Sequence, residues 1–121
     1  MSNWTDDNDY DYVYESDAID EEQHTEDVAI RINVLSITLN AQSVHTGGGI
    51  YCVQCDVDDK VTAIWGMSGE FWGCDIHNLN TDEHIGGKYS NVSSDSKDVN
   101  AVAQMIVDAM KQIRAGDFVH E

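Results

Sequence analysis

The sequence has no proline, and it has few basic residues. Six Lys and Arg residues stand against 23 Asp and Glu residues, so the formal net charge is −17. Because six scattered bases form no basic stripe, we do not expect direct binding to nucleic acid. The absence of proline agrees with a compact domain of sheet and helix, since proline interrupts both kinds of element.

Other missing features concern location. No apolar run approaches the roughly 20 residues of a membrane-spanning helix, so we expect no contact with a membrane. The N-terminus has neither the basic nor the apolar region of a secretory signal peptide. Three cysteines, an odd number, argue against a disulfide scaffold and indicate a reducing compartment. The sequence therefore predicts a cytoplasmic protein.

The acidic residues are concentrated at one end of the 121-residue chain. Residues 1–27 contain 11 carboxylates and no Lys or Arg. Residues 28–121 contain 12 carboxylates and all six bases, a net charge of −6. A segment as acidic as the first, with few aliphatic residues to bury, is expected to be disordered when free. We therefore predict an acidic arm over residues 1–27 and a single domain over residues 28–121.

Aromatic side chains are interleaved with the acids of this arm. Spaced carboxylates resemble a phosphate backbone to a basic protein groove, and aromatic rings can stack where bases would lie. The arm is therefore predicted to bind the basic surface of a nucleic-acid-binding protein; an arm that only solvates the chain is the alternative. The candidate partner-binding residues are Trp4, Asp6, Asp7, Asp9, Tyr10, Asp11, Tyr12, Tyr14, Glu15, Asp17, Asp20, Glu21 and Glu22.

Hydrophobic periodicity predicts several strands. Val28, Ile30, Ile32 and Val34 alternate with other residues at a period of two, which is typical of a half-buried strand. Further strands are predicted over residues 50–57, 61–65 and 71–76. Glycine-rich or polar loops are predicted over residues 47–49, 66–69, 78–83, 86–87 and 90–95.

The clearest predicted element is a helix near the end of the chain. Apolar residues recur at i, i+3, i+4 and i+7 over residues 99–113, which indicates an amphipathic helix. Asp95 or Ser96 is the expected N-cap, and Gly116 follows the last turn. The predicted fold class is therefore α+β, with an antiparallel β-meander of about four strands and one C-terminal amphipathic helix packed on a face.

The most specific local motif is a pair of metal-ligand spacings. Cys52-x-x-Cys55 is followed by Cys74-x-x-His77, which matches the requirements of a tetrahedral zinc site with three cysteines and one histidine. However, the first pair lies in an apolar, strand-like run, and residues three apart in a strand point to opposite faces. Two interpretations therefore remain, a zinc site or three small buried cysteines.

No pattern in the sequence defines a catalytic centre. A nucleophilic cysteine needs a nearby histidine and an orienting carboxylate, and three cysteines with five histidines offer such combinations without selecting one. Gly47-Gly48-Gly49 lacks the following residues of a phosphate-binding loop. We therefore do not expect an enzyme.

The stretch from Ser43 to Tyr51, with its Thr-Gly-Gly-Gly turn, opens a short hairpin-rich domain that closes with a helix. In this it resembles small orphan proteins of bacteriophages over residues 28–115. The resemblance implies a phage-type protein that inhibits or modulates a nucleic-acid-handling protein of the host by DNA mimicry, in the host cytoplasm. It assigns no individual residue.

Two alternative functions remain open. The first is a small zinc-stabilised interaction module built on the cysteine motif. The second is a virion or assembly accessory protein that oligomerises through Trp65, Trp72 or an open sheet edge. The expected state is a monomer or a small homo-oligomer.

Overall fold

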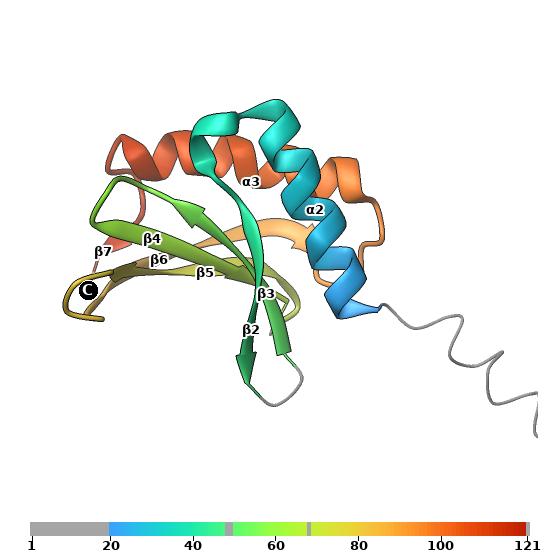
Figure 1. The fold of residues 1–121 in the computed structure, drawn as a ribbon, viewed down its shortest axis with the longest axis horizontal. Coiled ribbons are helices and arrows are strands. Elements are labelled where there is room, and N and C mark those ends of the chain that lie inside the picture. The colour runs from blue at the N-terminus through green and yellow to red at the C-terminus, as the bar shows by residue number, and fades with distance from the viewer. Residues whose placement is uncertain (1–19, 48–49, 68, 121) are drawn as a thin grey trace, which may run out of the picture.

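The computed structural model describes residues 20–47, 50–67 and 69–120. These parts of the chain form a six-stranded antiparallel sheet with two α-helices and one short 3-10 helix (Figure 1). The elements in chain order are α2 (Glu21–Leu35), η1 (Ile37–Leu39), β2 (Gln42–Gly47), β3 (Ile50–Asp56), β4 (Val61–Gly66), β5 (Phe71–Asn78), β6 (His84–Ser93), α3 (Val99–Arg114) and β7 (Val119–His120).

Each strand pairs with the next one along the chain, so the sheet is a meander in the order β2-β3-β4-β5-β6-β7. The predicted α+β class and the antiparallel meander are therefore confirmed. The predicted number of strands, about four, is too low, and the single predicted helix is joined by a second one.

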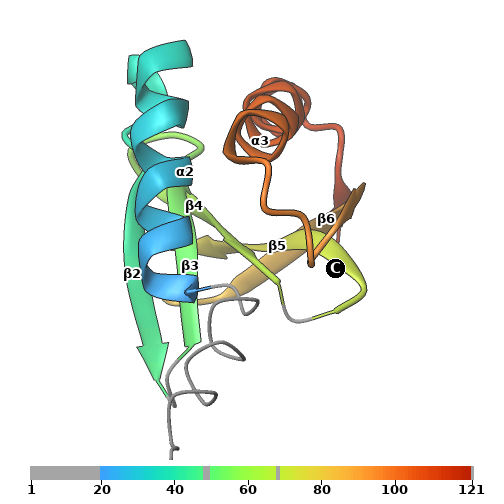
Figure 2. The ribbon, with the colours of Figure 1, turned by 90° about the vertical axis from the view of Figure 1, so that its right-hand side faces the viewer.

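Both helices pack on the same face of the sheet. Figure 2 shows α2 running in front of β2 and β3, with α3 beside it on the side of β5 and β6. The core fills the space between the helices and this face. Its largest members are Trp65 on β4 and Trp72 on β5, both completely buried. The predicted oligomerisation through Trp65 or Trp72 is therefore wrong, because neither side chain reaches the surface.

Helix α3 follows the prediction closely. Val102, Ile106 and Met110 are completely buried against the sheet, as their spacing requires. The N-cap is Asp98 rather than Asp95 or Ser96; its carboxylate accepts a hydrogen bond from the backbone N–H of Ala101, with a distance of 3.1 Å. The nearest acid to the apolar stripe caps the helix, since its carboxylate reaches the free N–H groups of the first turn.

The predicted strand over residues 28–34 is wrong, because these residues belong to α2. Val28 and Ile32 are completely buried, whereas Ile30 and Val34 are 64% and 67% exposed. In a helix, residues two apart point in nearly opposite directions and residues four apart share a face. The alternating apolar residues therefore supply two opposite faces of one helix instead of one face of a strand.

The N-terminal part of α2 explains why the helix forms. Asp20 is its N-cap and accepts a hydrogen bond from the backbone N–H of Gln23, and Glu21 and Glu22 occupy the first turn, where the helix dipole favours negative charge. Thr25 is completely buried and makes a hydrogen bond with Ser43 of β2, with a distance of 2.7 Å between the hydroxyl oxygens. The predicted boundary after residue 27 therefore falls inside a helix that packs on the domain.

The predicted loops at residues 86–87 and 90–93 are also wrong, because both stretches belong to β6. A Cβ atom on Gly86 would clash with the carbonyl oxygen of Val119. The glycine is thus required where β7 pairs closely with β6, rather than for a turn.

Candidate functional site

The four residues of the predicted zinc site lie on two faces of the sheet. Cys55 and Cys74 are buried on the face that the helices cover, whereas Cys52 and His77 are half-buried on the opposite, open face. The separation follows from the pleat, since side chains three apart in a strand point to opposite faces. In residues 20–47, 50–67 and 69–120, no three His, Cys, Asp or Glu side chains form a group that could hold a metal ion. The structure therefore does not bring the four predicted ligands together.

All three thiols have raised pKa values. Burial raises the pKa of Cys55 and of Cys74 from 9.0 to about 12. The pKa of Cys52 is also raised, chiefly by burial, although a hydrogen bond with Thr46 opposes the shift. Reactive cysteines have lowered pKa values, because the thiolate is the attacking species. Little thiolate is therefore expected at any of the three cysteines near neutral pH.

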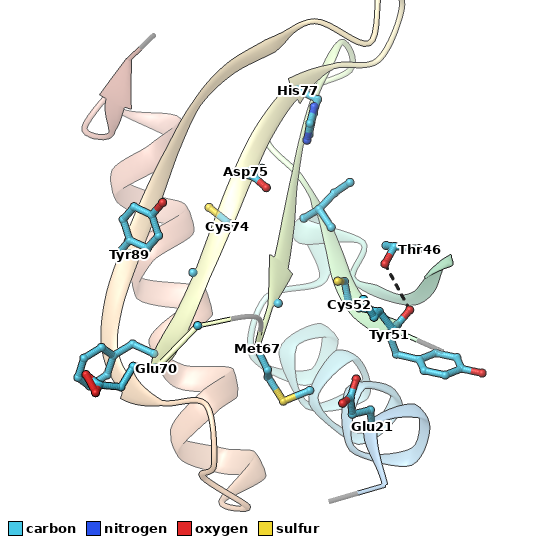
Figure 3. A pocket seen from close by; sticks show the side chains of 16 residues that line it. Glu21, Thr46, Tyr51, Cys52, Met67, Glu70, Cys74, Asp75, His77 and Tyr89 are labelled. Carbon is cyan, nitrogen blue, oxygen red and sulfur yellow. Dashed lines mark hydrogen bonds between the residues drawn. The ribbon is translucent and has the colours of Figure 1, made fainter. Parts of the chain in front are cut away.

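The open face of the sheet contains a groove with a volume of about 830 Å³. Figure 3 shows that its walls come from the start of α2 and from strands β2 to β6. Sites for small ligands commonly enclose about 300–1,000 Å³, so the groove has room for several side chains of a partner. The apolar residues that line it are Ile50, Ile64, Met67 and Phe71.

Two glycines lie at the base of the groove. Gly66 of β4 and Gly73 of β5 lie directly opposite each other in the sheet. A Cβ atom on Gly73 would lie 2.8 Å from Cδ1 of Tyr89, and one on Gly66 would lie 3.1 Å from Sγ of Cys52. The Tyr89 ring and the Cys52 thiol therefore occupy the space that side chains at these two positions would need.

The groove is electronegative. The carboxylates of Glu21, Glu70 and Asp75 line it, and its described lining residues include no Lys or Arg. The charges of Glu21 and Asp75 both contribute to raising the pKa of Cys52, as a negative field disfavours the thiolate. The groove therefore disfavours a negatively charged occupant.

A histidine pair borders the groove beside Asp75. The rings of His77 and His84 meet edge to face, with centroids 5.3 Å apart, and Nε2 of His84 lies 3.3 Å from Oδ1 of Asp75. Nδ1 of His77 is buried and has no hydrogen-bond partner among the described residues. Two further nitrogens share this property, Nε2 of His24 and Nε1 of Trp72, but both residues are buried in the core.

Most of the predicted partner-binding residues lie outside the described part of the chain. This applies to the ten candidates from Trp4 to Asp17. Asp20, Glu21 and Glu22 are described and form the start of α2. Glu21 also lines the groove, so one end of the groove meets the point where residues 1–19 join the folded domain.

The groove residues themselves are missing from the sequence-based candidates. A glycine inside a strand pattern often marks a close approach of another group; Gly73 lies inside the predicted strand 71–76, and Gly66 directly follows the predicted strand 61–65. The sequence predicts a loop from Gly66 and no special role for Gly73. The pairing of the two glycines across β4 and β5 depends on register, which the sequence does not state.

None of the described helices is both long enough and apolar enough to cross a membrane. Comparisons of the chain with family models, with curated proteins and with solved structures gave no match.

Proposed function

We propose that this protein is a non-catalytic, phage-type binding protein that occupies a basic surface of a host nucleic-acid-handling protein and thereby inhibits or modulates it. The observation that carries the proposal is the run of acids that continues from the arm into the fold. No Lys or Arg occurs before Arg31, whereas the acids extend to Asp27. Charge of one sign concentrated in this way accelerates encounter with an oppositely charged surface.

The start of α2 supports the same proposal. Asp20, Glu21, Glu22, Glu26 and Asp27 lie on the N-cap and the first two turns, where the helix holds their carboxylates at defined spacings. A helix with no basic residue in these turns keeps the negative charges uncompensated along its own surface. The folded end of the acidic segment therefore offers a partner a rigid surface, while residues 1–19 add six more carboxylates.

The test uses a full-length variant in which the six carboxylates of residues 1–19 are replaced by amides. Removal of residues 1–27 would be unsuitable, because it would delete the buried Thr25 and half of α2. The variant changes Asp6, Asp7, Asp9, Asp11, Glu15 and Asp17 to Asn or Gln.

Wild type and variant are used side by side to capture proteins from a bacterial lysate. We expect the wild type to retain a nucleic-acid-binding protein that duplex DNA displaces, and the amide variant to lose most of it. Binding is also expected to weaken by at least about tenfold between 50 and 200 mM salt, since the contact is electrostatic. Equal capture by both proteins, or a captured protein that DNA does not displace, would refute the proposal.

A further inference from the structure

The groove on the open face combines features that are suited to one kind of ligand. Its walls are apolar at Ile50, Ile64 and Phe71, and its floor is the glycine pair Gly66 and Gly73. The Tyr89 ring lies over Gly73 and the Cys52 thiol lies over Gly66, so the base of the groove presents an aromatic ring and a thiol to a ligand. The groove thus extends across neighbouring strands, from the start of α2 to β6 (Figure 3).

The charges of the groove select the sign of the ligand. Glu21 lies at one side, Glu70 near the turn before β5, and Asp75 on β5 itself, and the described lining has no base to neutralise them. A phosphate-bearing ligand would be repelled, whereas Lys and Arg side chains would find carboxylates at several points of the wall. Apolar walls suit the aliphatic stems of these two side chains while their charged ends reach the carboxylates.

Tyr89 adds an aromatic surface to the same groove. Its ring lies against the bare backbone of Gly73, and the side chain is 80% exposed. An exposed tyrosine ring attracts a guanidinium or an ammonium group placed over its face.

We propose that this groove is the docking site for an extended segment of the protein partner in which Arg or Lys side chains stand between apolar ones. The inference rests on the proposed function and assigns a second, folded contact to it beside the acidic arm. Residues 1–19 of the chain are a poor occupant, because they carry six carboxylates and no base. A second copy of the chain is disfavoured by the same argument, since its net charge is −17.

The experiment is an NMR titration of the full-length protein with a capped hexapeptide of alternating Val and Arg. We expect saturable shifts at the backbone amides of Ile64, Gly66 and Gly73, and none with a peptide in which Glu replaces Arg. A double variant, Glu70→Gln with Asp75→Asn, keeps the side-chain shapes and removes two charges. It is expected to weaken peptide binding by about tenfold, the combined effect of two partly exposed ion pairs.

The matched control removes two charges elsewhere, with Asp95→Asn and Asp108→Asn. Asp108 lies on the exposed side of α3, and Asp95 is exposed in the turn before that helix. The control is expected to bind the peptide nearly as wild type does. Equal weakening by the two double variants would overturn the inference, because only the total charge would then matter. Peptide-induced shifts confined to the acidic start of α2 would overturn it as well.

Two other occupants give distinguishable results. If replacing Tyr10, Tyr12 and Tyr14 by Ala shifts the groove amides without any peptide, the chain's own arm fills the groove and the inference fails. If the groove amides shift with protein concentration alone, a second copy fills it and the inference also fails. The amide variant of the arm is expected to bind the peptide unchanged. If the lysate experiment fails but the peptide still binds, the proposed function of the arm is rejected. The inference that the groove binds a basic peptide then still stands.

Discussion

Replacing Ile30 and Ile32 separately by Ala tests the assignment of residues 28–34 to a helix. The two residues would share a face in a strand, and both changes would then be costly. In the structure, Ile32 is completely buried between α2 and the sheet, and Ile30 points to solvent. The two substitutions remove the same atoms, so any difference in stability reports the environment of the side chain.

The expected difference is large. Ile→Ala in a core costs about 2–5 kcal/mol, because apolar burial is lost and a cavity remains. Ile32→Ala should therefore lower the free energy of unfolding by about 3 kcal/mol. At a urea dependence of about 2 kcal/mol/M, the unfolding midpoint would fall by about 1.5 M. Ile30→Ala should stay within about 0.5 kcal/mol of wild type, since Ala has the higher helix propensity and little burial is lost.

The assay is urea unfolding followed by circular dichroism and by the fluorescence of the buried tryptophans. Val28→Ala and Val34→Ala form a matched second pair, with Val28 buried and Val34 exposed. Similar losses of stability for Ile30→Ala and Ile32→Ala would refute the helical arrangement, and so would a larger loss for Val34→Ala than for Val28→Ala.

Three further predictions concern local interactions. Thr25→Val should cost about 1–3 kcal/mol, because the Ser43 hydroxyl loses its buried partner at 2.7 Å; a double-mutant cycle with Ser43→Ala measures the coupling, and a coupling near zero would contradict it. Asp98→Ala should cost about 1 kcal/mol through loss of the α3 N-cap, whereas Asp98→Asn should cost much less in the same unfolding assay. Cys52 should be the first thiol to react with a disulfide reagent in the native state, with a rate that rises with pH well beyond pH 8, since its raised pKa leaves little thiolate at neutral pH. Fast reaction of all three thiols at pH 7 without denaturant would contradict the burial of the other two.

The elements that sequence reasoning identified correctly are those whose period and partners are local. The apolar stripe of α3 recurs at helical spacing over four turns, and β3, β4 and β5 are apolar runs bounded by glycines or polar turns. Such patterns arise from residues close together in the chain. The predicted boundaries of these elements therefore differ from the observed ones by only one or two residues.

The errors occur where one pattern fits two structures. The β-branched residues from Val28 to Val34 satisfy a strand period, and they also fit a helix that is apolar on two sides. The acids of Asp20 to Asp27 pointed to an arm, but they cap and begin the same helix. Local propensity did not decide between the two, because the burial of Ile32 in the core and the hydrogen bond from Thr25 to Ser43 of β2 stabilise the helix from outside.

Some features of the candidate site could be predicted from the sequence, and others could not. The distribution of charge along the chain follows directly from the sequence, so the concentration of acidic residues in the first 27 residues could be stated from the sequence alone. The cysteine motif also came from the sequence, but its ligand geometry did not, because the pleat of β3 and β5 sends its members to both faces of the sheet. The groove could not be found in advance. It needs the register that sets Gly66 opposite Gly73 and brings Tyr89 over the latter.

The sequence by itself therefore determined the acidity, its position in the chain, the α+β class and the C-terminal helix, since each depends on composition or on short-range periodicity. Only the tertiary structure decided that residues 21–35 are helical and that the cysteines are separated. It alone brought Glu21, Glu70 and Asp75 to one groove. These properties arise from contacts between segments far apart in the chain, and strand register and helix packing set such contacts.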